Sequence, residues 1–293
     1  MMTTEAPAAT RIEVLYLDLL KKCLTRTIGA ETYSAAEPWF FLVRWWFFPV
    51  LAFLKARGWT IVRRQTDNHK SRSDGHDWPA DAETMIGLKR LDNLQYCIEH
   101  ILKDGVSGDL IETGVWRGGA SIFMRGVLKA YGDTTRLVWA ADSFQGLPKP
   151  RPGVWCDDER DRLWKYRNTL AVPLEHVRAN FARYGLLDDQ VRFLPGWFHD
   201  TLPGAPVEKL ALIRLDGDMY ESTMDSLSAL YPKLSVGGYC IVDDYYTHSG
   251  ARQAVSEYRQ HNGITEPIER IDWAGAFWRR GEAENGQAGR VHT

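Results

Sequence analysis

Two carboxylates, Asp216 and Asp218, lie two residues apart at the end of an apolar run, in the stretch LDGDMYEST. A second acidic pair, Asp243 and Asp244, ends the apolar run GYCIV. Carboxylates a few ångströms apart raise each other's pKa unless a cation or a proton is shared among them. Hard oxygen ligands suit Mg²⁺ or a similar divalent ion, which takes few protein ligands and keeps several waters. We therefore predict a divalent cation between these acids.

A glycine-rich stretch, ETGVWRGGAS, follows another apolar run and predicts a ligand-binding turn. Gly114 lets the backbone approach a ligand, but the G-x-G of a dinucleotide site is absent. Glu112 suits the ammonium of an amino-acid moiety better than a pyrophosphate. Asp142, at the end of the next run, is placed to accept hydrogen bonds from ribose hydroxyls. An acid for an ammonium, an acid for a ribose and no phosphate cradle describe S-adenosylmethionine.

These groups need a scaffold that brings them to one edge. From residue 108 onward, five short apolar runs alternate with segments of helical periodicity, which predicts an α/β fold with a parallel, doubly wound sheet. Ligands bind beyond the carboxyl ends of such strands, and the polar groups follow the runs directly. Trp197 and Phe198, after the third run, either flank the adenine or pack in the core. The predicted donor-binding residues are Met85, Glu112, Thr113, Gly114, Ser121, Asp142, Ser143, Gly196, Trp197 and Phe198.

Composition is that of a soluble globular protein that has no nucleic-acid partner. The 293 residues are 44% hydrophobic, and 36 basic side chains balance 38 acidic ones, without a long Lys/Arg run. The four cysteines lie far apart and form no Cys-x-x-Cys pair, which fits a reducing compartment. The first residues lack a signal-peptide pattern, so we expect a cytoplasmic protein.

The N-terminal part, residues 1–80, is predicted to be a helical extension of a methyltransferase-like domain at 81–293. Within it, segment 38–59 is dense in aromatic residues and flanked by basic ones, and 68–81 is a polar loop. Arg44, Pro49 and Lys55 interrupt the run, whereas a membrane span needs about 20 apolar residues. We interpret 38–59 as an arm buried on the main domain or on a sister subunit of a homo-oligomer. Peripheral membrane contact and a true span remain alternatives.

The motifs resemble the macrocin O-methyltransferase (TylF-type) family. The resemblance rests on LYLDLLKKCLT, TMIGLKRLDNLQYCIE, DLIETGVWRGGASIFMRGVL, ADSFQGLPKP, LIRLDGDMYESTMDSL and GGYCIVDDY, and covers most of the chain from residue 81 onward. It implies a class I methyltransferase sheet, S-adenosylmethionine as donor and Mg²⁺ held by aspartates. By this resemblance the metal ligands are Asp216, Asp243 and Asp244, and the base is Asp218 or Asp216. Segment 38–59 departs from the family pattern.

The predicted reaction is Mg²⁺-assisted O-methylation of a sugar hydroxyl on a glycosylated natural product or glycan. A catechol is an alternative acceptor, because it is also a vicinal diol. More distant alternatives are a Mg²⁺-dependent phosphoester hydrolase and a membrane-associated scaffold without catalysis. Of the histidines, His248 is the best candidate for a catalytic role because it follows DDYYT, and the segment from Trp155 to Trp164 is a candidate lid.

Overall fold

The computed structural model describes residues 11–28, 32–35, 41–59, 61–65, 69–77, 81–151, 153 and 163–282. Its centre is a seven-stranded sheet in the order β5-β4-β3-β6-β7-β9-β8. The strands are β3 (Asp109–Thr113), β4 (Val138–Asp142), β5 (Val191–Pro195), β6 (Leu210–Leu215), β7 (Leu234–Val242), β8 (Glu269–Arg270) and β9 (Ala276–Arg279). The first five pair in parallel, and β9 returns antiparallel to β7 and β8. The predicted α/β fold with a mostly parallel sheet is confirmed.

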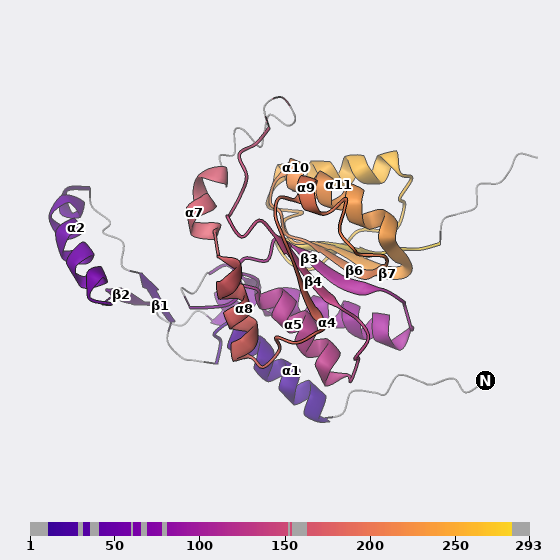
Figure 1. Ribbon diagram of the computed structural model, residues 1–293, viewed down its shortest axis with the longest axis horizontal. Coiled ribbons are helices and arrows are strands. Elements are labelled where there is room, and N and C mark those ends of the chain that lie inside the picture. Colours follow the sequence, from indigo (N-terminus) through magenta and orange to yellow (C-terminus); the bar gives the residue numbers. More distant parts are fainter. Residues whose placement is uncertain are drawn as a thin grey trace, which may run out of the picture.

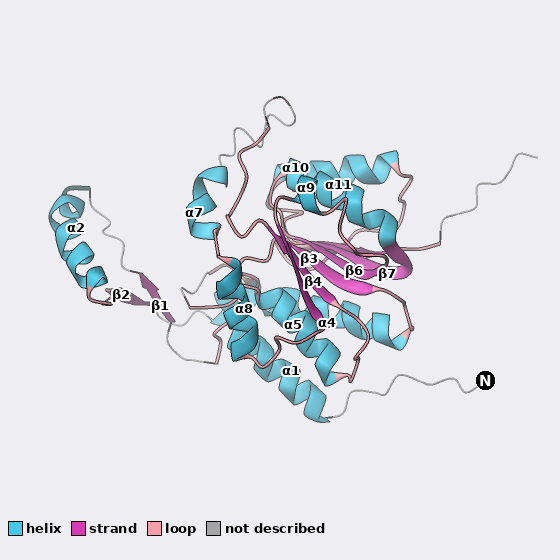
Figure 2. Ribbon diagram, in the orientation of Figure 1, coloured by secondary structure: helices cyan, strands magenta, loops and turns pink. Residues whose placement is uncertain are grey.

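Helices cover both faces of this sheet (Figure 1, Figure 2). On one face lie α1 (Arg11–Leu24), α4 (Leu88–Lys103), α5 (Gly119–Ala130) and α8 (Leu174–Arg183), and on the other α9 (Phe198–Thr201), α10 (Tyr220–Leu230) and α11 (Ser249–His261). Short connecting helices are η1 (Leu163–Tyr166), α7 (Arg167–Leu170) and η2 (Tyr231–Lys233). The central strand β6 is mostly apolar and is buried at every position, and β3 is buried at every position but its first, because helices exclude water from both faces of the sheet there.

Helix α1 lies in the same layer as α5. Its residues Leu17, Leu20 and Leu24 are buried in a core cluster that includes Phe123 of α5. A Cβ placed on Gly126, in the middle of α5, would lie 2.4 Å from Cδ2 of Leu20, so a larger residue there would force the Leu20 side chain to shift. The domain division near residue 81 stays a prediction, but this helix before it shares the core of the main domain.

The aromatic segment forms α2 (Phe41–Ala56), which stands apart from the two helical layers (Figure 1). It lies between β1 (Thr32–Ala35) and β2 (Val62–Gln65) in the chain, and these two strands pair antiparallel as a separate two-stranded sheet. Its described side chains include the exposed Phe48, Val50 and Phe53. Among the helices that the structure describes, none combines the length and apolar character needed to cross a membrane. Packing on a sister subunit and peripheral membrane contact both stay predictions.

The predicted polar loop at 68–81 contains a short helix, α3 (His69–Asp74), so the prediction of a loop is wrong for residues 69–74. Contacts distant in sequence stabilise it. Arg72 is buried, pairs with Asp77 at 2.8 Å and donates a hydrogen bond to the carbonyl oxygen of Thr25. His76, just after the helix, stacks on Trp273 with 4.4 Å between ring centroids. Such tertiary contacts leave no periodic signal in a local sequence window.

Candidate active site

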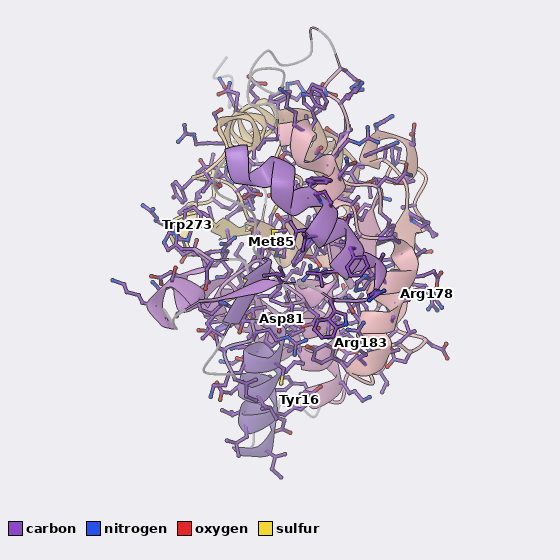
Figure 3. All side chains as sticks on the ribbon, turned by 90° about the vertical axis from the view of Figure 1, so that its left-hand side faces the viewer. Tyr16, Asp81, Met85, Arg178, Arg183 and Trp273 are labelled. Atoms are coloured by element: carbon purple, nitrogen blue, oxygen red, sulfur yellow. The ribbon has the colours of Figure 1, made fainter. Side chains whose placement is uncertain are left out.

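A cavity of about 660 Å³ opens at the carboxyl ends of the parallel strands. Met85 and Trp273, both on its wall, lie on the side of the main body that faces α2 (Figure 3). Most of the residues predicted to bind the donor, hold the metal or act as base line it, namely Met85, Glu112, Gly114, Asp142, Ser143, Gly196, Trp197, Phe198, Asp216, Asp218, Asp243 and Asp244. Thr113 and Ser121 are buried behind the wall and do not line it. The structure thus brings the two predicted sets together in one cavity.

The turn after β3 is held against the turn after β6. Gly114 has φ +90°, and a Cβ placed on it would lie 1.8 Å from the carbonyl oxygen of Asp216. Only glycine tolerates both the dihedral angle and the contact. This requirement fixes the glycine-rich turn directly beside the first acidic pair.

Asp142 organises this turn from the neighbouring strand. Its Oδ2 accepts hydrogen bonds from the backbone N–H groups of Val115 at 2.7 Å and Trp116 at 3.2 Å, and its Oδ1 accepts one from Phe144 at 2.7 Å. Burial raises the pKa of this carboxyl, while the three N–H donors act in the opposite direction. The role of Asp142 toward a ribose remains a prediction, and shaping the loop is a role that the sequence did not predict.

Glu112 is almost fully buried and already has two partners. Its Oε1 accepts a hydrogen bond from Nη1 of Arg214 at 2.5 Å, and its Oε2 accepts one from the hydroxyl of Ser121. Burial raises the pKa of Glu112, and the positive charge of Arg214 opposes that rise. Binding of an ammonium group by Glu112 therefore stays a prediction, and any such group would share the carboxylate with Arg214.

Three of the predicted acids converge as one cluster. Carboxylate oxygens of Asp216, Asp243 and Asp244 lie within 4.8 Å of one another. Asp243 is buried between Arg214, whose Nη2 lies 2.5 Å from its Oδ1, and Arg90 on its other oxygen. Asp244 differs, because its Oδ2 is buried and lacks a hydrogen-bond partner among the described residues. An unpaired buried carboxylate oxygen is costly, and a divalent cation would satisfy it.

The pKa values of the cluster follow from burial and like charge. Burial and the neighbouring carboxylate of Asp243 raise the pKa of Asp216 well above its usual range, and burial and Asp218 do the same to Asp244. Burial, followed by the charge of Asp216, raises the pKa of Asp218 to about 7. Asp243 is the exception: burial acts to raise its pKa, but Arg214 and Arg90 hold it below the usual value. The cluster thus holds excess negative charge that a cation would relieve.

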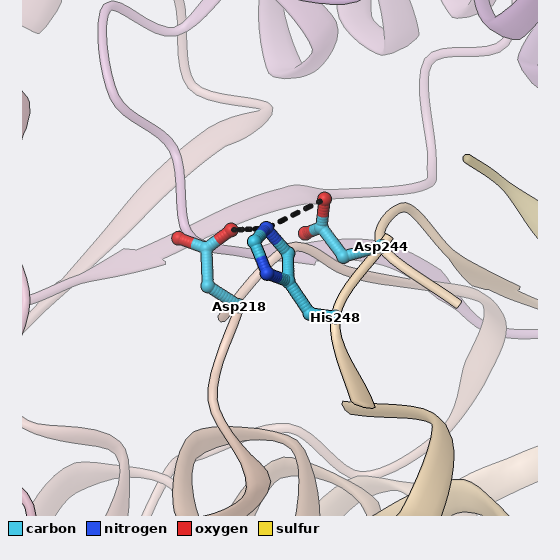
Figure 4. Close-up of side chains that lie close together, drawn as sticks. All are labelled: Asp218, Asp244 and His248. Carbon is cyan, nitrogen blue, oxygen red and sulfur yellow. Dashed lines mark ion pairs between the residues drawn. The ribbon is translucent and has the colours of Figure 1, made fainter. Parts of the chain in front are cut away.

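Asp218 adopts a left-handed backbone conformation with φ +59°, which short polar residues tolerate better than most. Its carboxylate faces the imidazole of His248, which also faces Asp244 (Figure 4). The distances from Nε2 are 3.7 Å to Asp218 and 3.9 Å to Asp244. This second trio has oxygen and nitrogen atoms close enough for a shared cation. His248 therefore lies at the candidate site, and its catalytic role stays a prediction.

The loop after β4 reaches over the cavity to α10. Arg151 donates hydrogen bonds to Glu221 from its backbone N–H at 2.7 Å and from Nε at 2.5 Å. Lys149 lies over the ring of Trp164, 5.6 Å from its centroid. Residues 155–162 of the predicted lid lie outside the described residues.

The sequence analysis did not identify two arginines that are central to the site. Arg214 is 2% exposed and bonds to Glu112, Asp216 and Asp243. Arg90 bonds to Asp243 and Asp272. A signal for the first was available, because an arginine inside the buried run ALIRLDGD must have acidic partners.

Comparison with known proteins places this geometry among methyltransferases. Residues 13–280 match the family described as Macrocin-O-methyltransferase (TylF). The chain is 54% identical over 265 residues to 8-demethyl-8-(2,3-dimethoxy-alpha-L-rhamnosyl)-tetracenomycin-C 4'-O-methyltransferase of Streptomyces olivaceus, covering 90% of this chain and 92% of that one. It is 55% identical over 268 residues to mycinamicin III 3''-O-methyltransferase of Micromonospora griseorubida, covering 91% and 96%.

Solved structures agree with this match. The structure of the O-methyltransferase NovP is similar with a TM-score of 0.79 and 45% sequence identity, covering 92% of this chain and 99% of that one. The calicheamicin methyltransferase CalS11 is similar with a TM-score of 0.53 and 19% identity, covering 96% and 98%, which shows a shared fold.

Proposed function

Because the chain belongs to the macrocin O-methyltransferase family and is an O-methyltransferase, we propose that it methylates a sugar hydroxyl of a glycosylated natural product. The donor is S-adenosylmethionine, and a divalent cation assists. The observation that supports this most directly is a single cavity lined by both the glycine-rich turn at Gly114 and the carboxylates at Asp216, Asp218 and Asp244. A donor site and a hydroxyl-activating site must adjoin for methyl transfer.

The donor site is proposed from the turns after β3, β4 and β5. S-adenosylmethionine, when bound, supplies an electrophilic methyl group on a sulfonium. Glu112 would accept a hydrogen bond from its ammonium group, and Asp142 would accept hydrogen bonds from its ribose hydroxyls. Trp197 and Phe198 would flank its adenine. The positions of these residues around the cavity support the assignment. The turn after β3 is held from both sides, because Asp142 accepts a hydrogen bond from Val115 and Gly114 packs against the backbone of Asp216.

The metal site is proposed at Asp216, Asp243 and Asp244. Their oxygens are close enough to share one ion, and the partner-free Oδ2 of Asp244 fits a hard cation. A divalent cation bound there would lower the pKa of the acceptor hydroxyl and orient its oxygen. Asp243, fixed by Arg90 and Arg214, would keep one ligand in place before an ion arrives.

Asp218 is the proposed general base. It lines the cavity beside the metal ligands, and burial with the charge of Asp216 raises its pKa to about 7, which suits proton removal near neutral pH. Asp218 would take the hydroxyl proton as the acceptor oxygen attacks the methyl group that a bound donor supplies, with the donor's sulfur as the leaving group. Asp216 is the alternative base, but its Oδ2 already accepts a hydrogen bond from Arg214 at 2.7 Å, which makes it a weaker candidate.

The test is methyl transfer from labelled S-adenosylmethionine to a panel of deoxysugar glycosides and catechols, with added Mg²⁺ and with EDTA. We expect product with a glycoside that carries a free sugar hydroxyl, and activity lost in EDTA and restored by Mg²⁺. Methylation of catechols alone would make the aromatic diol the acceptor. Full activity in EDTA would remove the cation from the mechanism.

A further inference from the structure

One guanidinium group touches both halves of the proposed site. Nη1 of Arg214 donates to Oε1 of Glu112 at 2.5 Å and to Oδ2 of Asp216 at 2.7 Å. Its Nη2 donates to Oδ1 of Asp243 at 2.5 Å. The first carboxylate belongs to the proposed donor site, and the other two belong to the proposed metal site. No other described residue is hydrogen-bonded to both Glu112 and a proposed metal ligand.

The sharing of Nη1 has an electrostatic consequence. Arg214 is 2% exposed, so solvent screens these contacts little, and one positive charge is divided among three carboxylates. A cation on Asp216 or Asp243 would withdraw the negative charge of that carboxylate from Arg214 and would repel the guanidinium. Arg214 would then pair more strongly with Glu112. A second positive group approaching Glu112 would meet a carboxylate that is already better neutralised.

We propose that Arg214 couples the donor and metal sites antagonistically, so that each occupant weakens the binding of the other. The inference rests on the proposed function, since it takes Glu112 as the acceptor for the donor's ammonium and the aspartates as metal ligands. By thermodynamic linkage the factor must be the same in both directions. Arg214 is therefore a positioning residue. It sets how its single positive charge is divided between Glu112 and the proposed metal ligands.

Arg90 provides the matched comparison. It is also a buried arginine, and it bonds to Asp243 and Asp272. It supports the metal site but forms no hydrogen bond or ion pair with Glu112 within the described part of the chain. A role limited to neutralising the acids would make Arg90 and Arg214 equivalent, whereas coupling requires Arg214 alone.

The experiment is calorimetry with S-adenosylhomocysteine, which keeps the ammonium group and cannot donate a methyl. Its Kd is measured in EDTA and in saturating Mg²⁺, and the Kd of Mg²⁺ is measured with and without it. We expect Mg²⁺ to raise the Kd of S-adenosylhomocysteine about threefold or more, and the reverse titration to give the same factor. Methylthioadenosine, which lacks the amino-acid moiety, should bind equally with and without Mg²⁺.

Two variants place the coupling on Arg214. Arg214→Lys replaces the planar guanidinium with a single ammonium that cannot bridge the same acids. The ratio of the Kd values for S-adenosylhomocysteine with and without Mg²⁺ should therefore fall toward one. Arg90→Lys should keep the ratio of the unmodified chain. If Arg214→Lys does not fold, as judged by circular dichroism, Glu112→Gln removes the charge at the donor end and should also abolish the factor.

The outcomes separate the two proposals. Absence of both S-adenosylhomocysteine and Mg²⁺ binding in the unmodified chain would overturn the proposed function, and the coupling with it. Binding of both without mutual effect, with mutual strengthening, or with an unchanged factor in Arg214→Lys would overturn the coupling and leave the proposed function standing. A metal effect on methylthioadenosine equal to that on S-adenosylhomocysteine would also overturn it, because no ammonium is then involved.

Discussion

Gly114 packs directly against the backbone of Asp216. A Cβ added to Gly114 would lie 1.8 Å from the carbonyl oxygen of Asp216, so the glycine-rich turn after β3 and the acidic turn after β6 are in direct contact. The contact is with the backbone carbonyl of Asp216, so a side-chain rotation cannot relieve it. Two turns that belong to different strands are thus held as one unit, and a disturbance in either should reach both proposed binding functions.

Gly114→Ala should therefore destabilise the fold by about 2 kcal/mol or more and abolish donor binding, because both the φ of +90° and the close contact are lost. Chemical denaturation and calorimetry with S-adenosylhomocysteine measure the two effects. Gly105→Ala is the control. Gly105 has φ +63° but nothing lies within 4 Å of its added Cβ, so only about 1 kcal/mol is expected. Equal costs at both positions would contradict the interlocked-turn interpretation.

Asp218→Asn should lower kcat by about 10² or more, because the amide cannot take the hydroxyl proton. The affinities for S-adenosylhomocysteine and Mg²⁺ should change little. Steady-state kinetics and calorimetry separate the effects, and Asp200→Asn, at an exposed carboxylate, serves as the control. Rescue of Asp218→Asn by excess Mg²⁺ would make that residue a ligand and leave Asp216 as the better base.

The two neighbouring acids Asp243 and Asp244 should respond differently to the same change. Asp244→Asn should raise the Mg²⁺ concentration needed for activity without lowering the melting temperature, because Oδ2 of Asp244 has no partner to lose among the described residues. Asp243→Asn should weaken metal binding and also cost roughly 2 to 4 kcal/mol of stability, because it leaves Arg90 and Arg214 undercompensated. Thermal melts with and without Mg²⁺ make the comparison. A large loss of stability in Asp244→Asn would argue against an open ligand position.

Asp188 should give the fold a pH-dependent contribution away from the site. Side-chain hydrogen bonds from the buried Arg125 lower the pKa of Asp188 in the folded state. Its stabilisation is therefore present above the unfolded pKa, near 4, and is lost as the pH falls through the lower folded value. Asp188→Asn should cost about 1 kcal/mol at pH 7, discounted for partial exposure. Urea denaturation should show the difference in unfolding free energy between the unmodified chain and Asp188→Asn shrinking from pH 7 to pH 3.5. Asp189→Asn, at the neighbouring exposed position, is the control.

The exposed residues of α2 allow the arm interpretation to be tested. If α2 packs on a sister subunit, replacing both Phe48 and Phe53 by Ser should reduce the mass seen in sedimentation, because apolar surface would leave an interface. Lipid affinity should be negligible before and after the change. Co-pelleting of the unmodified chain with anionic vesicles, lost on substitution, would favour the membrane alternative.

The sequence was most informative where a local pattern decides the structure. Apolar runs of strand length gave β3 to β7, and the polar residues that follow those runs do meet at one edge. Pairings between distant residues could not be predicted this way. Glu112 meets Arg214 across 102 positions and Arg90 meets Asp243 across 153, and no local window contains both partners. For the same reason the strand pair β8 and β9 and the short helix α3 were not foreseen.

The close packing of α1 on Gly126 also affects how the chain folds during its synthesis. Leu17 and Leu20 leave the ribosome about 100 residues before α5, and at roughly 5 to 20 residues per second that interval lasts on the order of 5 to 20 s. During it Leu20 lacks the surface of α5 on which it packs in the finished fold. The nascent chain therefore carries apolar side chains of α1 that are not fully covered early in synthesis, and the contact between Leu20 and Gly126 can form only after α5 has emerged.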